Sequence, residues 1–509
     1  MGSETELKFN ISPEDLKRLR VVRSFRPLDD EPKKSEKLWS VYFDTAECRL
    51  KRKGISLRVR HVGGERLQTI KTQTSGVPFS RGQWEHKIDS DVPDLRFARG
   101  TPLAPLVTKK LTSTLVPVFA TQVHRVTRSL REGGSRIEMA LDQGVVRAGR
   151  KVQPISEVEL ELKRGKVADL FKLAKVIEGL VPATLAFKSK SERGYDLFAG
   201  AIDSSSVAQE ITVESGMSTG KAFQAIVRSI LRHLVDNESA VRNGDSEGLH
   251  QMRVDLRKLR AAISIFSELV NDSQTKAIKG ELIWMTNELG PARDLDVYIK
   301  STVEPAEKLR PRKRGLREFG DDLVGRRKAA FKKMKDAVDS PRYRSLILDT
   351  LQWIEAGDWK HSRACASRPV GRFAADTIAR QRKKVLKKQK GLAEFDSLQL
   401  HRLRIKFKKL RYSCDFFGSL CDGRKMKRHL KRFNKCLSEL QDDLGALNDI
   451  SVHQKLAAAL VADTKPRQRP ARDIAAGVVS GREQSDIQPL LKAAGKTARK
   501  LAQMRPFLT

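Results

Sequence analysis

Acidic and basic side chains recur at every second position in several short segments of the first 200 residues. Such sets are Glu4, Glu6 and Lys8, then Arg58 and Arg60, and finally Glu157, Glu159 and Glu161. Because successive side chains of a β-strand point to opposite faces of the sheet, the members of each set would share one face. Converging carboxylates bind hard cations such as Mg²⁺ or Mn²⁺, and clustered guanidinium and ammonium groups bind phosphate oxygens. The spacing therefore indicates metal-assisted chemistry on a phosphate compound.

Further charged residues occupy strand-like positions in the same region. They are Lys71, Arg81, Glu85, Arg125, Lys188 and Lys190. A sheet with one charged face usually turns that face to solvent, and this interpretation stays open for any single segment. The opposite positions are only moderately apolar, however, and charges of both signs are concentrated. We therefore favour a closed barrel with a charged lumen.

The second half of the chain contains a repeated basic motif, HQMRVDLRKLR from His250 and HRLRIKFKKLR from His401. The basic residues are His250, Arg253, Arg257, Lys258 and Arg260 in the first copy and His401, Arg404, Lys408, Lys409 and Arg411 in the second. Helix positions 0, +3, +7 and +10 share one stripe, so each copy predicts a row of cations that repel one another unless an anion is present. A single row is also typical of a solvated face, but its duplication favours anion binding.

A second repeated motif follows each basic motif. LGPARDLDVY begins at Leu289 and LGALNDISVH begins at Leu444, which places Asp294 and Asp449 at matching positions. These carboxylates could orient the basic side chains or cap a helix. The duplication predicts two four-helix-like halves related by a pseudo-twofold axis.

The spacing of apolar residues changes along the chain. Up to about residue 200, short alternating segments separated by turn signals predict an antiparallel α+β domain of about eight strands. Helices are expected within it at 13–19, 101–111 and 166–180. From residue 213 onward the spacing is helical, so we expect an all-α helical-bundle domain.

These patterns predict a multidomain protein. Its parts are a barrel domain at 1–200, a small polar linker at 201–212, and a helical domain at 213–509 with repeats at about 213–360 and 361–509. Two connections rich in Pro, Arg, Lys and small polar residues, at 303–320 and 463–486, are expected to be disordered.

Amino-acid composition limits the classes of molecule that this protein is expected to bind. The 509 residues include 99 Lys and Arg and 62 Asp and Glu, which gives a net charge of +37. Like charges in such excess repel one another unless the protein usually binds an anion. Nucleic acid, an anionic membrane and polyphosphate are the candidates. Aromatic residues make up only 6% of the chain, which disfavours stacking on single-stranded bases. Phosphate without bases fits better, although charge alone does not exclude nucleic acid.

Cellular location follows from what the chain lacks. Its five cysteines are odd in number and scattered, which is typical of a reducing compartment. No signal-like start and no apolar run of about 20 residues is found, so we expect a cytoplasmic protein that does not enter membranes. Polyphosphate granules are a candidate location within the cytoplasm.

The N-terminal motifs resemble the CYTH domain, also called the triphosphate tunnel metalloenzyme fold, whose signature is Glu-x-Glu-x-Lys on the first strand. The resemblance continues through YFDT, TIK, RGQWE, SEVELELK and FKSKSERGY and covers nearly all of residues 3–198. It implies a divalent metal, Mg²⁺ or Mn²⁺, held by Glu4, Glu6 and one or two of Glu157, Glu159 and Glu161. It also implies a tunnel that binds triphosphate through Lys8, Arg58, Arg60, Lys71, Arg125, Lys188 and Lys190. Glu85 is a candidate to activate the attacking water.

The two basic motifs resemble the CHAD domain over roughly residues 213–506. This helical domain has characteristic histidines, is associated with binding inorganic polyphosphate and commonly follows a CYTH domain. The resemblance implies that the two basic stripes bind polyphosphate.

The expected activity is that of an inorganic triphosphatase, a metal-dependent hydrolase of inorganic triphosphate or short polyphosphate, joined to a polyphosphate-binding domain. Phosphoryl transfer needs position and charge stabilisation more than covalent help, and a lumen of cations supplies both. Two alternatives stay open. One is a non-catalytic polyphosphate-binding protein, and the other is a tunnel enzyme acting on an organic triphosphate, as a thiamine triphosphatase or an adenylate cyclase.

Overall fold

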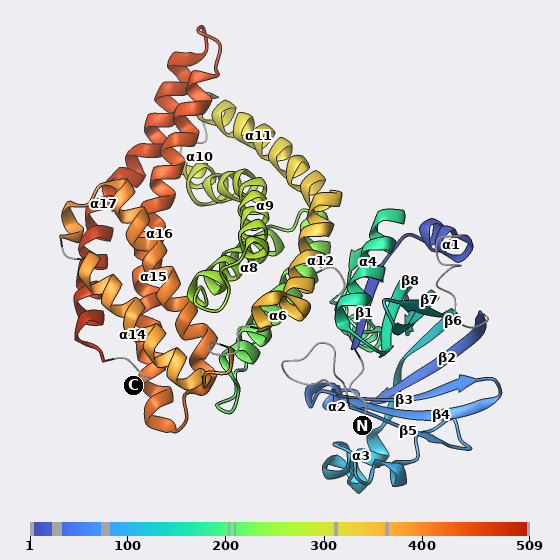
Figure 1. Ribbon diagram of the computed structural model, residues 1–509. Helices are drawn as coiled ribbons and strands as arrows, with labels where there is room; N and C mark the ends of the chain where they lie inside the picture. The colour runs from blue at the N-terminus through green and yellow to red at the C-terminus, as the bar shows by residue number, and fades with distance from the viewer. Residues whose placement is uncertain are drawn as a thin grey trace. The chain divides into compact units, whose positions relative to one another are not determined.

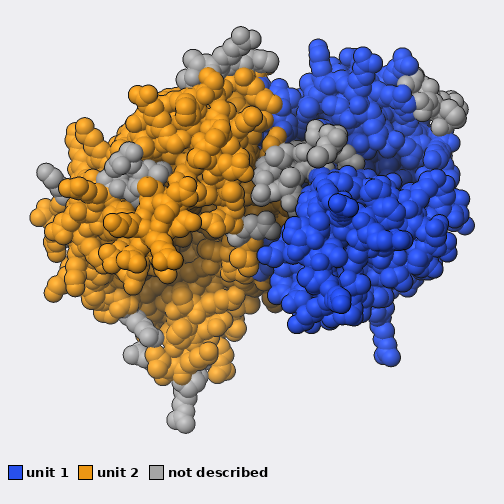
Figure 2. All heavy atoms as spheres, turned by 90° about the horizontal axis from the view of Figure 1, so that it is seen from below, with its two compact units in different colours: residues 1–206, 341–357 blue, residues 207–340, 358–509 orange. Residues whose placement is uncertain are grey.

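The structure, a computed structural model, describes residues 5–22, 33–72, 82–201, 204–207, 210–309, 314–361, 366–389 and 391–505. It divides into two compact units (Figure 2): residues 1–206 with 341–357, and residues 207–340 with 358–509. The first unit ends close to residue 200, where the sequence pattern changes. It also includes 341–357, a segment that the sequence pattern places in the helical half.

The first unit is built on a nine-stranded antiparallel sheet in the order β5-β4-β3-β2-β6-β7-β8-β1-β9 (Figure 1). The strands are β1 (Thr5–Asn10), β2 (Lys34–Asp44), β3 (Ile55–Val62), β4 (Glu65–Thr72), β5 (Gln83–Lys87), β6 (Val116–Glu132), β7 (Ser135–Ala148), β8 (Lys151–Arg164) and β9 (Thr184–Leu185). The α+β prediction is confirmed. Among the described strands, however, no hydrogen bonds join the edges β5 and β9, so the sheet does not close as predicted. Both edge strands are short, and β9 is only two residues long, which leaves little backbone to form a closing ladder.

Helices cover parts of this sheet. They are α1 (Pro13–Val21), α2 (Arg49–Arg52), α3 (Lys109–Thr114), α4 (Val167–Leu180), α5 (Lys190–Ala199) and α12 (Pro341–Ala356), with 3₁₀ turns at Leu95–Ala98 and Ala104–Leu106. The Ser12 hydroxyl caps α1 by accepting from the amide of Asp15 at 3.0 Å. Helix α12 is fixed to α4 through ion pairing of Asp349 with Lys175 at 2.8 Å, so it belongs to this unit by its contacts.

The two faces of the central strands differ in character. Leu7 lies opposite Leu160 in the β1–β8 ladder, and Leu160 lies opposite Met139 in the β7–β8 ladder, and all three are buried. The residues that alternate with them, Lys8 and Glu159 among them, project from the other face. Apolar packing under α4 thus holds one face, and the charged residues occupy the other.

The second unit consists of helices, as predicted. They are α6 (Thr219–Asp236), α7 (Glu238–Arg242), α8 (Ser246–Ile265), α9 (Ser273–Tyr298), α10 (Glu304–Leu309), α11 (Arg314–Val338), α14 (Val370–Lys388), α15 (Ser397–Phe417), α16 (Arg424–Ala462) and α17 (Arg469–Gln503), with a π-helical turn at Ile299–Val303 and 3₁₀ turns at Asp358–His361, Leu392–Glu394 and Gly418–Leu420. In the described part of the chain, no helix is long and apolar enough to cross a membrane.

The internal repeat is visible in the packing of this unit. The basic motifs lie on α8 and α15, which contact each other, and the second motifs lie on α9 and α16, which also contact each other. Tyr298 and His453 occupy matching positions of the two second motifs, and their rings stack with centroids 4.5 Å apart. Equivalent residues therefore meet at the centre of the unit, as a pseudo-twofold arrangement requires.

The prediction of disordered connections is wrong. The described residues of 303–320 lie mainly in α10 and α11, and 469–486 lies in α17. Phe319 and Val479 are fully buried in one core cluster with Tyr298. Apolar residues at helical spacing outweigh the polar composition here, because they bury enough surface to order the segment. Residues 310–313 lie outside the part that the structure describes.

Candidate functional site

The register of the sheet brings charged residues from four strands onto one face. Lys8 of β1 lies opposite Glu159 of β8, Glu157 lies opposite Asp142 of β7, and Asp142 lies opposite Arg125 of β6. Directly opposed residues of an antiparallel pair place their side chains on the same face. Residues from distant parts of the sequence thus form a single cluster.

Three carboxylates form the centre of this cluster. Oxygen atoms of Asp142, Glu157 and Glu159 lie within 4.8 Å of one another, and the side chains of the first two are fully buried. Lys190 Nζ lies 2.6 Å from Asp142 Oδ2 and 3.0 Å from Glu159 Oε1, and it also contacts Glu157. Arg125 donates to Asp142 at 2.6 Å and to Glu159 at 2.5 Å. Lys190 thus bridges all three carboxylates, and Arg125 bridges two of them.

Two further cations complete the neutralisation of the carboxylates. Lys8 Nζ lies 2.8 Å from Glu159 Oε1, and Arg193 Nη1 lies 3.3 Å from Glu157 Oε2. Arg193 and Lys190 both belong to α5, whose start is fixed by a capping box in which Ser189 and Glu192 bond each other's backbone amides. The cap therefore sets the position from which α5 directs its cations at the cluster.

Neighbouring opposite charges offset the effect of burial on the pKa values of Asp142, Glu159 and Lys190. Burial alone would raise the pKa of Glu159, but Lys190 and the other nearby cations hold that pKa well below its usual value. The pKa of Asp142 is lowered in the same way, by Lys190 and Arg125 against the effect of burial. The carboxylates in turn raise the pKa of the Lys190 ammonium, which burial alone would lower. Each group depends on the charge of its neighbours, so removal of one changes the charge balance of the rest.

A second set of cations lies farther along the same face, on β3 and β4. Arg60 donates through Nε to Ser40 Oγ at 3.1 Å, and burial together with the neighbouring Arg58 lowers the pKa of Arg60 to about 10. Arg58 is only 9% exposed, and its Nε has no hydrogen-bond partner among the described residues. Arg58, Arg60 and Lys71 lie close enough to Tyr42 to lower the pKa of its hydroxyl, although burial acts in the opposite direction. Within this set, the Arg58 Nε is the donor for which the described structure shows no acceptor.

Other predicted residues of the first unit have different partners. Glu6 lies opposite Glu161 in register, and Glu161 pairs with Lys163 at 2.7 Å. Lys188 pairs with Asp196 at 2.9 Å. Neither Glu6 nor Glu161 belongs to the three-carboxylate cluster found among the described residues.

Glu85, predicted to activate water, lies on the edge strand β5. It is exposed and accepts a hydrogen bond from Thr69 Oγ1 at 3.1 Å. Its negative charge raises the pKa of Arg60, so Glu85 interacts electrostatically with this arginine of β3. Glu4 and Arg81 lie outside the described residues.

Asp142 is the site residue that sequence reasoning missed. The alternation of Glu138, Ala140 and Asp142 continues the predicted strand RIEMAL, and it would have extended the charged face by one position. The pairing with Glu157 depends on strand register, which the alternation alone does not give.

The three carboxylates fit a divalent cation. Asp142, Glu157 and Glu159 offer only oxygen ligands, and each can supply one oxygen within a small common volume. Hard cations such as Mg²⁺ and Mn²⁺ prefer this donor set and usually keep positions for water or phosphate.

Lys190→Met should destabilise the protein when metal is removed. Without the ammonium, buried carboxylates lose a shared cation, and breaking a buried charge network of this kind costs about 3–5 kcal/mol. We expect the first thermal transition in chelator to fall by roughly 10 °C, and Mg²⁺ or Mn²⁺ to restore part of the loss.

Lys188→Met is the matched control for this experiment. Lys188 lies two residues away and its ion pair with Asp196 is more exposed, so the cost should stay below about 1 kcal/mol. Equal transition temperatures for the two variants in chelator would contradict a central role for Lys190.

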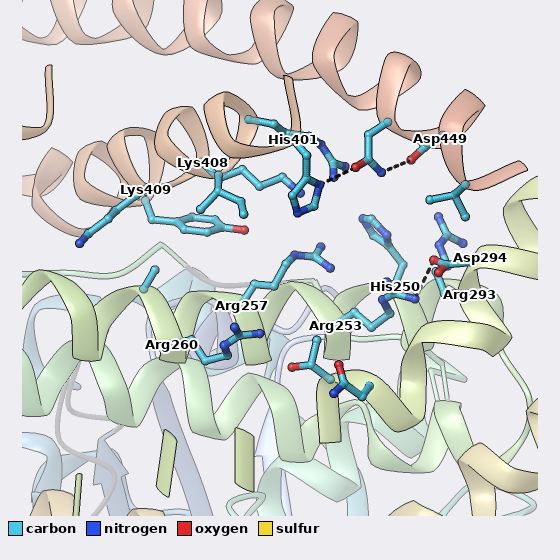
Figure 3. A pocket seen from close by; sticks show the side chains of 18 of the residues that line it. His250, Arg253, Arg257, Arg260, Arg293, Asp294, His401, Lys408, Lys409 and Asp449 are labelled. Carbon is cyan, nitrogen blue, oxygen red and sulfur yellow. Dashed lines mark hydrogen bonds and ion pairs between the residues drawn. The ribbon is translucent and has the colours of Figure 1, made fainter. Parts of the chain in front are cut away.

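The second unit contains a pocket of about 700 Å³ between the two basic motifs (Figure 3). Figure 3 shows side chains of α8 and α9 facing those of α15 and α16 across this space. Eight of the ten residues predicted to bind polyphosphate line it: His250, Arg253, Arg257, Arg260, His401, Arg404, Lys408 and Lys409. Lys258 and Arg411 do not line it, and Arg411 instead donates to Gln441 Oε1 at 2.9 Å.

The pocket has more polar groups than the motifs suggested. Arg293, Asn448, Lys279, Tyr412 and His453 also line it. Arg293 and Asn448 are matching residues of the second motifs, one position before the predicted Asp294 and Asp449. Their different chemistry breaks the symmetry of the repeat at the wall of the pocket.

Matching arginines of the two repeats have different partners. Arg253 donates to the carbonyl of Gly290 at 2.6 Å and to Asp294 Oδ1 at 3.1 Å, which ties α8 to α9. The Nε of both arginines lacks a hydrogen-bond partner, but for its counterpart Arg404 the described residues also show no hydrogen bond or ion pair of the other guanidinium nitrogens. The second repeat therefore presents the more available guanidinium group.

Positive charge is crowded around Lys408. Burial, followed by Arg404 and Arg257, lowers the pKa of Lys408 to about 6, and the carboxylate of Asp449 offsets this only in part. Burial and Arg293 also lower the pKa of His250. Both shifts favour the neutral forms of these two groups.

Two family models match the chain. The CYTH domain model matches residues 2–195, and the CHAD domain model matches residues 225–458. A curated relative, an inorganic triphosphatase from Haemophilus influenzae, is 32% identical over 200 residues. The match covers 38% of this chain and 55% of the relative, so the chain spans about half the length of that protein.

Two solved structures match parts of the chain. The CHAD domain from the plant Ricinus communis is 28% identical, with a TM-score of 0.49, and the match covers 58% of this chain and 96% of that chain. A putative adenylyl cyclase from Hippeastrum, described as having a dominant triphosphatase activity, is 16% identical, with a TM-score of 0.26 over 38% of this chain and 95% of that chain.

Proposed function

From the premise that the chain carries a CYTH domain followed by a CHAD domain, we propose that it hydrolyses inorganic triphosphate or short polyphosphate and binds polyphosphate. Hydrolysis is assigned to the charged face of the first unit and requires a divalent metal. Binding of longer chains is assigned to the basic pocket of the second unit. The name of the relative from Haemophilus influenzae, an inorganic triphosphatase, supports the assigned substrate.

One observation carries this proposal: three converging carboxylates and a set of buried arginines share one face of the sheet. A triphosphate carries several negative charges, so a site for it needs cations and a place for the metal that accompanies it. Carboxylates alone would repel the substrate, and arginines alone would leave no metal ligands. The combination distinguishes this face from an ordinary solvated surface.

Each group has an assigned role. Asp142, Glu157 and Glu159 would hold the metal, which when bound supplies positive charge to phosphate oxygens. Arg58, whose Nε lacks a hydrogen-bond partner within the described structure, would donate to a phosphate oxygen together with Arg60.

Proton abstraction from the attacking water contributes less to this reaction than charge stabilisation does. The transition state of phosphoryl transfer is loose, so charge stabilisation and alignment contribute more than a strong base. A carboxylate with a depressed pKa, such as Glu159, is a poor proton acceptor but a good cation ligand. We assign Glu85 to positioning Arg60, because its charge acts on that guanidinium.

Glu159→Gln should abolish most metal-dependent hydrolysis while leaving polyphosphate binding by the second unit unchanged. The amide keeps the size of the side chain but removes the charge that pairs with Lys8, Arg125 and a metal. We expect a fall in kcat of at least about 100-fold, the loss typical of removing one charge-stabilising group.

Phosphate release from the full chain measures this, with triphosphate, pyrophosphate, ATP, thiamine triphosphate and long polyphosphate as substrates and Mg²⁺, Mn²⁺ or chelator added. Turnover of an organic triphosphate in preference to triphosphate would replace the proposed substrate. No turnover of any substrate by a folded protein would leave a polyphosphate-binding protein without this activity.

Polyphosphate binding should strengthen as the pH falls from about 8 to 6. Lys408 of the free protein has a pKa of about 6, and the groups that face it are Arg404 on its own helix, Arg257 and Arg253 on α8, and Asp449 on α16. An anion in the pocket raises the pKa, so the complex binds more protons than the free protein. Affinity therefore rises with falling pH, by up to about tenfold per unit for each proton taken up, and levels off below about pH 6.

Isothermal titration in buffers of different ionisation enthalpy counts the protons taken up. Lys408→Arg is the control, because its guanidinium stays charged and should flatten the pH dependence while raising affinity at pH 8. A steep pH dependence that persists unchanged in this variant would assign the protons to other groups.

Arg404→Gln and Arg253→Gln should have different effects, although the two residues match in the repeat. Arg404 is available to the anion, so its loss should weaken polyphosphate binding by about 10- to 100-fold with little change in thermal stability. Loss of Arg253 also removes the bonds to Gly290 and Asp294, so it should lower the unfolding temperature as well. Equal effects of both variants on both quantities would show that the repeats are functionally symmetric.

A further inference from the structure

Outside the pocket, basic residues form one continuous surface on α14 and α15, which pack against each other. Arg380, Lys384 and Lys388 follow one another at intervals of four on α14. Arg402, Lys406 and Lys409 follow at intervals of four and three on α15. Residues at these intervals share one face of a helix. We call these six residues the α14–α15 stripe.

The charges of the stripe lie close together. Burial, followed by Lys388, Lys384 and Arg402, lowers the pKa of Lys406. Burial, followed by Lys384 and Arg380, lowers the pKa of Lys409 to about 8. Cations on one helix thus act on those of the other, so the two rows adjoin across the helix pair.

Few carboxylates neutralise this surface. Arg380 pairs with Glu268 at 2.5 Å. For Lys384, Lys388 and Lys406, no ion pair is found within the described part of the chain. Adjacent cations without partners repel one another, and an anion that spans them removes this cost.

The stripe begins where the pocket ends. Lys409 belongs to both, and Figure 3 shows it at the end of the pocket away from His250 and His401. Its Nζ donates to Ser264 Oγ at 2.6 Å, which holds the ammonium at the edge of the cavity. Lys279 also lines the pocket and acts on Lys409. A linear anion leaving the pocket at this end meets the stripe next.

We propose that the α14–α15 stripe is a second binding segment for linear polyphosphate, contacted only by chains that extend beyond the pocket. The second unit therefore prefers long chains to inorganic triphosphate. Aromatic residues make up only 6% of the chain, which favours a phosphate chain without bases over single-stranded nucleic acid. This inference rests on the proposed binding of polyphosphate by the pocket.

The test compares two triple variants of the full chain, in chelator so that no hydrolysis occurs. One is Lys384→Gln with Lys388→Gln and Lys406→Gln. The matched control is Lys328→Gln with Lys332→Gln and Lys335→Gln, three exposed lysines of α11 at intervals of four and three. Both variants lose the same net charge, so a general electrostatic effect would be equal in the two.

We expect the stripe variant to bind long-chain polyphosphate about 10- to 100-fold more weakly, while triphosphate binding changes no more than in the control. The dependence of log affinity on log salt should flatten by about one unit for each phosphate group that the variant no longer binds. Lys406→Gln alone repeats the measurement if the triple variant melts early.

The outcomes separate the two proposals. If the wild type binds triphosphate and long chains equally well, or if both triple variants weaken long chains equally, the stripe is a solvated face and the pocket proposal stands. If the wild type binds neither ligand, the proposed polyphosphate binding fails, and the stripe proposal fails with it.

Discussion

A buried charge in this protein requires an opposite charge to replace the water that it loses. The clearest case is the Lys190 ammonium among Asp142, Glu157 and Glu159. Each of these ions would cost several kcal/mol to bury alone, so the cluster can exist only if the strands and α5 bring all of its members together. A slip of one residue in the β7–β8 register would turn the carboxylates toward the face that holds Leu160. The charge requirement and the sheet register therefore depend on each other.

The second unit meets the same constraint in another way. Its pocket gathers cations from both repeats, with Asp294 and Asp449 as the carboxylates that line it. The protein lowers the pKa of Lys408 instead of supplying a matching carboxylate. Such a pocket carries less charge at neutral pH than its residue count suggests, because the lowered pKa favours the neutral amine. The charge of this pocket therefore changes with pH, whereas the first unit balances its carboxylates with the fixed cations Lys190 and Arg125.

Much of this arrangement follows from sequence, but only where a pattern is local. Alternation along one strand correctly predicts that Glu157 and Glu159 share a face, and helical spacing brings His250 and Arg257 to one pocket. Asp142 was missed because its partners lie on other strands, and register is set by the whole sheet. The expected disorder near Phe319 and Val479 failed for a related reason, since tertiary burial orders segments of polar composition. The assignment of α12 to the first unit likewise depends on its contact with α4, far away in sequence.

The internal repeat predicts the position of single residues but not their contacts. Duplication predicts that His250 and His401 occupy matching positions, and both line the pocket. Their partners differ, because His401 Nδ1 lies 2.8 Å from the amide oxygen of Asn448, whereas the matching residue in the first repeat is Arg293. The Asn448 amide can bond the His401 imidazole in a fixed orientation, whereas burial, followed by the Arg293 guanidinium, lowers the pKa of His250. Duplication thus sets where each histidine lies, and the residues beside it give the two histidines different surroundings.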